Sequence, residues 1–132
     1  MRKPDADEFR WNLSTFIAYG FKSISHFCWA SPDRVSVEDG GEDMRDHVID
    51  QEGKRTALYE PAVYYNWQIR QLGDFLMGID CVHAYHSGAN TPEGVELLPK
   101  NFLLQPKNKS DNFIVSLFTS KDDSEKYIIL MN

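Results

Sequence analysis

Apolar side chains recur at helical spacing near the start of the chain, and they would form one face of a helix. The positions that form this face are Phe9, Leu13, Phe16 and Ile17. Asp7 is predicted to cap a helix that begins at Glu8. Gly20 is predicted to end this helix, because glycine readily adopts the left-handed conformation found at helix ends.

A short apolar segment follows the predicted helix. Residues Ile24 to Trp29 are rich in apolar and aromatic side chains, which predicts a buried strand. A polar and acidic stretch from Ser31 to Asp46 comes next and contains two adjacent glycines. We expect a long loop there, of the kind that is usually functional or disordered.

The hydrophobic pattern then predicts a short hairpin and a second helix. The hairpin lies within Val48 to Leu58 and turns at Gly53. The helix begins at Glu60-Pro61 and ends at Gly78. Its apolar stripe consists of Tyr65, Ile69, Leu72 and Leu76.

The remaining pattern is typical of β-structure. Strands are predicted at Cys81–His86, Asn112–Thr119 and Lys126–Met131. The last two would be joined by a turn at Lys121–Ser124. The chain therefore reads as an α/β part followed by an antiparallel β part, with a boundary near Ser87 to Glu93.

Composition narrows the classes of partner. The formal net charge of -6 disfavours binding to nucleic acid and to anionic membrane surfaces. No apolar run is long enough to span a bilayer. The two cysteines, Cys28 and Cys81, lack metal-ligand spacing, and no phosphate-binding or dinucleotide-binding motif occurs. The sequence therefore predicts no cofactor and no metal.

Two stretches of sequence resemble known enzymes. The stretch from Glu8 to Trp29 is similar to the seventh helix and eighth strand of clan A glycoside hydrolases, and most similar to the β-galactosidase-like family 42. The positions that match are Ala18, Tyr19, Gly20, Lys22, Ile24, Phe27 and Trp29. Val48 to Arg55 resembles the segment that follows the long loop in that group. The resemblance extends to about Gly88.

This resemblance implies a fold and a domain division. Residues 1–88 would be the last helix-strand-helix units of a (β/α)8 barrel, and residues 89–132 would begin an antiparallel C-terminal β-domain. The catalytic carboxylates of such enzymes follow the fourth and seventh strands, so the resemblance implies that this chain lacks both. We expect the chain alone to be inactive.

Trp29 is the first candidate for substrate binding. At the end of an eighth barrel strand it would lie at the catalytic face, where a ring can stack on a sugar. The alternative, equally weighted, is that Trp29 only closes the top of the barrel. His26, in the same predicted strand, is expected to be a hydrogen-bonded core group rather than a catalyst.

Glu42 and Arg45 are the other candidates. Family 42 has a Glu-x-x-His in this loop, and Glu42 matches the glutamate. Arg45 replaces the histidine, which puts galactose specificity in doubt. The alternative is a solvated acidic loop, because several Asp and Glu residues lie nearby.

The resulting hypothesis is a segment of a glycoside hydrolase whose partner is carbohydrate. The alternatives are a non-catalytic carbohydrate-binding or assembly module, or an inactive gene remnant. An eighth barrel strand also needs neighbours on both edges. Without the missing N-terminal part of the barrel, we expect the chain to aggregate, oligomerise or repack into a small open sheet.

Overall fold

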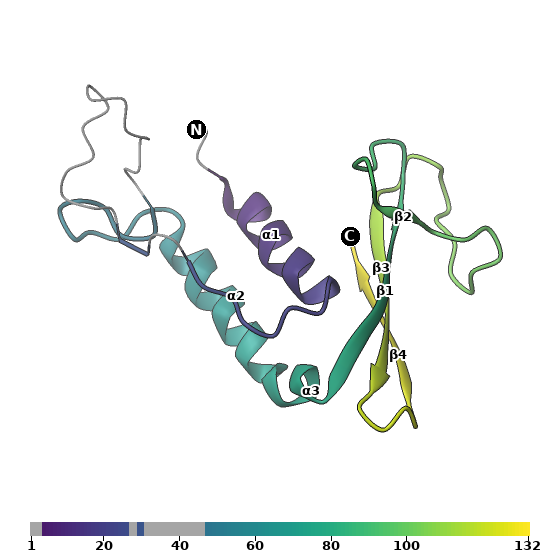
Figure 1. The fold of residues 1–132 in the computed structure, drawn as a ribbon. Coiled ribbons are helices and arrows are strands. Elements are labelled where there is room, and N and C mark those ends of the chain that lie inside the picture. The colour runs from purple at the N-terminus through teal and green to yellow at the C-terminus, as the bar shows by residue number, and fades with distance from the viewer. Residues whose placement is uncertain (1–3, 27–28, 31–46) are drawn as a thin grey trace. The chain divides into compact units, whose positions relative to one another are not determined.

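The computed structural model describes residues 4–26, 29–30 and 47–132, and these residues form a mixed α/β fold. They contain three helices and one open four-stranded sheet, drawn in Figure 1. The chain divides into two compact units. The first comprises described residues within 1–13 and 23–72, and the second comprises residues 14–22 and 73–132.

Helix α1 (Ala6–Ala18) begins earlier than the sequence predicted. The backbone N–H of Glu8 donates to Asp5 Oδ1 at 2.9 Å, and the N–H of Asp5 donates to Glu8 Oε2 at 3.0 Å. This reciprocal pair is a capping box, which satisfies two N–H groups at the helix start. Asp5 is therefore the cap, and the prediction that Asp7 caps a helix starting at Glu8 was wrong.

The end of α1 is confirmed at Gly20. The N–H of Phe21 donates to Phe16 O at 3.0 Å, and the N–H of Gly20 donates to Ile17 O at 2.9 Å. Gly20 has φ +81°, which completes a Schellman motif. The Phe16 and Phe21 rings meet edge to face, as the motif's usual hydrophobic contact.

The predicted strand at Ile24–Trp29 does not form in its described part. Residues 24–26 have no regular secondary structure, and residues 27–28 lie outside the described residues. A strand is stabilised by pairing, and no described segment pairs with residues 24–26. An isolated parallel bridge joins Ala30 to Ile49, one residue after the predicted end of the strand at Trp29.

The predicted hairpin is present as a short turn. Ile49 bridges Arg55 antiparallel, Asp50 N–H donates to Lys54 O at 2.9 Å, and Gly53 adopts positive φ. The helix expected from Glu60 to Gly78 is instead two helices, α2 (Tyr59–Gln71) and α3 (Gly73–Met77). Glycine is a poor helix former, and the break falls immediately before Gly73.

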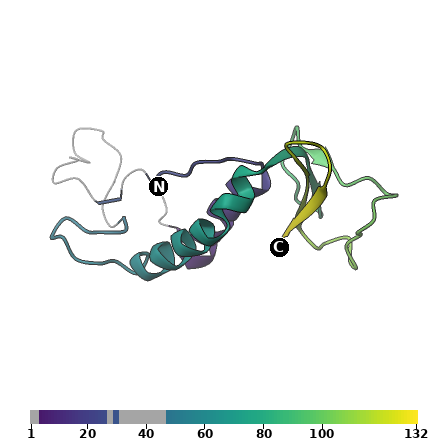
Figure 2. The ribbon, with the colours of Figure 1, turned by 90° about the horizontal axis from the view of Figure 1, so that it is seen from below.

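The sheet belongs to the second unit, and its strands have the order β2-β1-β3-β4. Their bounds are Ile79–Ser87 for β1, Glu96–Leu97 for β2, Phe113–Ser120 for β3 and Lys126–Met131 for β4. Strand β3 is antiparallel to both β1 and β4, which confirms three predicted strands, and β2 is parallel to β1. The connection between β1 and β3 extends away from the strands, as Figures 1 and 2 show.

One face of this sheet carries the core of the second unit. Ala18 packs with Ile114 and Met131, and Leu76 packs with Ile79 and Phe118. Lys22 holds the segment that links α3 to β1. Its Nζ donates to Leu76 O at 2.6 Å and also to Ile79 O.

The β3–β4 turn depends on the ionised carboxylate of Asp122. The Ser120 and Ser124 hydroxyls donate to its Oδ1 at 2.6 and 2.8 Å, and these bonds lower its pKa from 3.8 to about 2. A depressed pKa stabilises the fold above pH 3.8, and this stabilisation is lost as pH falls through about 2. We expect Asp122→Asn to lower the urea midpoint at pH 6, and the difference from wild type to vanish near pH 2.

Asp123→Asn is the control for that experiment, since it removes one charge from the same turn without removing the Asp122 carboxylate. Urea unfolding of all three proteins across the acid range measures the effect. A difference between Asp122→Asn and wild type that stays constant down to pH 2 would contradict the role given to the carboxylate.

Candidate functional site

Trp29 lies in the first unit, where its backbone is fixed by the hairpin. The N–H of Ile49 donates to Trp29 O at 3.1 Å, next to the Ala30–Ile49 bridge. The side chain remains 38% exposed. A fixed backbone with a partly open ring leaves an aromatic surface that a ligand can contact.

Aromatic and polar side chains surround Trp29. The His26 ring lies 5.5 Å from the Trp29 ring, and the Tyr59 ring lies 6.4 Å away at 64°. The Phe9 ring stacks on the His26 ring at 5.3 Å and 16°. We call these four residues, with Arg55 and Asn66, the Trp29 cluster.

His26 is oriented within the cluster by a hydrogen bond. Its Nε2–H donates to Asn66 Oδ1 at 3.2 Å. An amide oxygen can only accept a hydrogen bond, so the His26 Nε2 must carry the proton and act as the donor. The expectation that His26 is hydrogen-bonded is confirmed, although the ring is half-buried rather than fully buried.

Helix α2 supplies the other wall of the cluster. Tyr59 and Asn66 are seven residues apart, which places them on one helix face. The Arg55 guanidinium lies 4.2 Å from the centre of the Tyr59 ring and 3.4 Å from Glu60 Oε1. The cluster therefore combines ring faces with a cation and an amide.

Such a cluster offers surfaces that are suited to ligand binding. Aromatic faces stack on apolar CH surfaces, while guanidinium and amide groups hydrogen-bond hydroxyls. Hydrolysis of a glycoside by the usual route needs two carboxyl groups about 5–10 Å apart on either side of the bond. None of the six described side chains of the cluster is a carboxylate, and the Glu60 carboxylate is paired with Arg55.

The structure brings together only part of the predicted site. Trp29 is described, but Glu42 and Arg45 lie outside the described residues. The sequence did not predict that Phe9, Tyr59, Arg55 and Asn66 belong to the Trp29 cluster. The seven-residue spacing of Tyr59 and Asn66 would place both on one helix face if the second helix were predicted to begin at Tyr59, where it does, and not at Glu60.

Comparison with known proteins gives no family. No protein-family model, curated protein or solved structure matches this chain.

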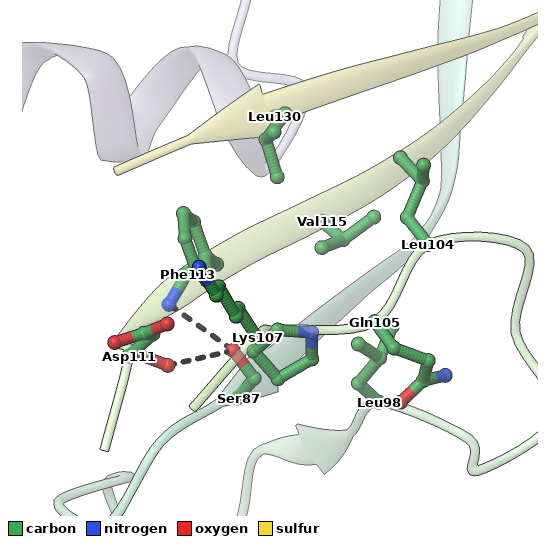
Figure 3. A pocket seen from close by; sticks show the side chains of 10 residues that line it. Ser87, Leu98, Leu104, Gln105, Lys107, Asp111, Phe113, Val115 and Leu130 are labelled. Atoms are coloured by element: carbon green, nitrogen blue, oxygen red, sulfur yellow. Dashed lines mark hydrogen bonds between the residues drawn. The ribbon is translucent and has the colours of Figure 1, made fainter. Parts of the chain in front are cut away.

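A cavity lies in the second unit, on the opposite side of the sheet from the core. It has a volume of about 200 Å³ and is shown in Figure 3. Its lining residues are mostly apolar and include Leu98, Leu104, Phe113, Val115 and Leu130. Ser87 Oγ donates to Asp111 O at 3.1 Å and accepts from Phe113 N–H at 3.2 Å, so this hydroxyl is already satisfied.

The two histidines of β1 have different partners. His83 Nδ1 lies 3.0 Å from Glu96 Oε2, whereas His86 Nε2 lies 2.6 Å from Tyr19 Oη. Burial lowers the pKa of His86 and raises that of Cys81. Cys28 lies outside the described residues.

Metal sites and membrane-spanning helices are both absent from the described residues. No group of three or more His, Cys, Asp or Glu side chains is arranged to hold a metal ion in that part of the chain. None of the helices there combines the length and apolar character needed to cross a membrane.

Proposed function

We propose that this chain is a segment of a glycoside hydrolase, similar to the β-galactosidase-like family 42, and that it contributes to substrate binding. In this proposal residues 1–88 are the last units of a (β/α)8 barrel, and residues 89–132 begin the C-terminal β-domain. Trp29 stacks on a sugar ring, and Glu42 and Arg45 contact its hydroxyls.

The partly exposed Trp29 ring and its contacts with other side chains carry the proposal. Trp29 is 38% exposed, which is close to Trp11 at 39% and less than Trp67 at 57%, so the contacts around the ring matter more than its exposure. His26 and Tyr59 border the ring, and Asn66 orients His26. This composition favours carbohydrate over nucleic acid, because the net charge of -6 repels phosphates.

One feature of the backbone is compatible with the proposed β-domain. Strands β3 and β4, which both lie within residues 89–132, pair antiparallel, as expected of a β-domain that follows the barrel.

The first expected result concerns catalysis. The chain alone should not hydrolyse aryl-galactosides or other aryl-glycosides at any pH, because the proposal places both catalytic carboxylates on strands outside this sequence. Release of nitrophenol measures turnover directly. Robust turnover that disappears in Glu42→Gln would contradict the missing carboxylates.

The second expected result concerns binding. Trp29→Ala should weaken the affinity for galactosides by about tenfold, because loss of one aromatic stacking contact costs about 1–1.5 kcal/mol. Calorimetric titration measures the dissociation constant. Trp67→Ala is the matched control, since Trp67 is 57% exposed on α2 in the same unit and has no ring contact with the cluster among the described residues. Equal losses in the two variants would count against Trp29.

A further inference from the structure

The cavity of Figure 3 lies between the sheet and the connection that joins β1 to β3. Phe113 and Val115 of β3 and Leu130 of β4 line it from the sheet, and Leu98 and Leu104 line it from the connection. Its volume is about 200 Å³. An apolar cavity of about 150 Å³ takes up one benzene molecule, so this one has room for an apolar group of about eight carbons.

Four polar side chains also line the cavity, and three of them are engaged within the protein. The Ser87 hydroxyl bonds two backbone groups. The Asp111 carboxylate accepts from the backbone N–H of Asn108 at 3.0 Å and also from its side-chain amide. The Gln105 amide nitrogen donates to two carbonyls of the connection at 2.8 and 3.2 Å. Lys107 is the fourth, and its ammonium group has no hydrogen bond or ion pair within the described part of the chain.

The charge around Lys107 also favours an anion. Residues 97–110 contain three lysines and no aspartate or glutamate, whereas the chain as a whole has a net charge of -6. The connection is therefore a locally cationic part of an acidic chain. In small-molecule sites an apolar lining supplies the contact area, while a few polar groups fix the orientation of the ligand. A free lysine beside apolar side chains thus matches a molecule with an anionic end and an apolar body.

We propose that this cavity binds a small carboxylic acid with an apolar tail of up to about eight carbons. The tail lies against Val115 and Leu130, and the carboxylate pairs with Lys107. A carbohydrate does not fit this lining, because its hydroxyls would lose their water partners against apolar side chains. The site uses residues of the second unit only, so it does not depend on the proposed sugar site.

Calorimetric titration of the whole chain with four probes separates the roles of the tail and the charge. Octanoate should bind most tightly. Butanoate should bind at least about tenfold more weakly, because each buried methylene strengthens binding by about two- to fourfold. Octanol and octylammonium should bind at least about fivefold more weakly than octanoate, since neither pairs with a lysine. Octanoate that binds no more tightly than any one of the other three probes would overturn the proposal.

Lys107→Met keeps an apolar side chain and removes the charge. This variant should bind octanoate about fivefold more weakly and should bind octanol with unchanged affinity. Lys100→Met is the matched control, because Lys100 is an exposed lysine of the same connection that does not line the cavity. It should leave the affinity for octanoate unchanged. Equal losses in the two variants would contradict the pairing of the carboxylate with Lys107.

Methyl signals of the wild-type protein locate the bound tail without any variant. Octanoate should shift the signals of Val115, Leu104 and Leu130 in a saturable way. Those of Leu103 should stay unchanged, since Leu103 is 83% exposed on the same connection and does not line the cavity. Equal shifts at Leu103 would indicate non-specific adsorption, and shifts of the cavity signals on dilution of the free protein would show that a second copy occupies the cavity. Either result would overturn the proposal.

Discussion

Phe118→Ala should lower the free energy of unfolding of the second unit by about 3–5 kcal/mol. Phe118 is 2% exposed at the centre of β3 and packs with Leu76 and Ile79. Removing the ring leaves a cavity between α3 and the sheet that the surrounding strands are too constrained to fill. Because domains are stable by only about 5–15 kcal/mol, this loss removes much of the total.

Urea unfolding followed by circular dichroism measures this effect. Phe75→Ala is the comparison, because Phe75 is also aromatic and lies in the same unit but is 42% exposed. It should cost clearly less than Phe118→Ala. Similar losses from both substitutions would show that the sheet is not packed as described.

Gly20→Ala should destabilise the same unit by about 2–4 kcal/mol, combining strain and a steric clash. Gly20 has φ +81°, and a Cβ there would lie 2.5 Å from Cys81 Cβ. That atom is fixed to the backbone of β1, so the end of α1 or the strand must move. The Schellman motif at the helix end would be distorted with it.

Gly94→Ala separates the two causes. Gly94 has a similar φ of +84°, but no atom lies within 4 Å of the Cβ position. This variant should therefore show only the cost of the left-handed backbone, about 1–2 kcal/mol. Thermal unfolding of both variants provides the comparison. Equal destabilisation would mean that the approach of Gly20 to Cys81 is not close.

The sequence predicted those elements whose signals are local. The end of α1 at Gly20 and the strands β1, β3 and β4 were predicted correctly, because helix ends and strands produce patterns among neighbouring residues. The position of the helix cap was missed by two residues. Asp5 and Asp7 are both plausible caps by type, and only the reciprocal bonds with Glu8 distinguish them.

The errors arose where structure depends on distant partners. An apolar run such as Ile24 to Trp29 becomes a strand only when another strand pairs with it, and no described segment pairs with residues 24–26. The neighbours of Trp29 were missed for the same reason. Phe9 and the two α2 residues Tyr59 and Asn66 are distant from Trp29 in the sequence, and the spacing of Tyr59 and Asn66 indicates only that they share a helix face.

The indole N–H signals of the three tryptophans test the central claim most directly. Trp11, Trp29 and Trp67 each give one such signal in a ¹H–¹⁵N spectrum, and Trp29→Phe identifies the relevant one. Titration with a β-galactoside should shift the Trp29 signal in a saturable way and leave that of Trp67 unchanged. If the Trp29 signal does not move with any of a panel of sugars, or moves no more than that of Trp67, the carbohydrate-binding role is contradicted.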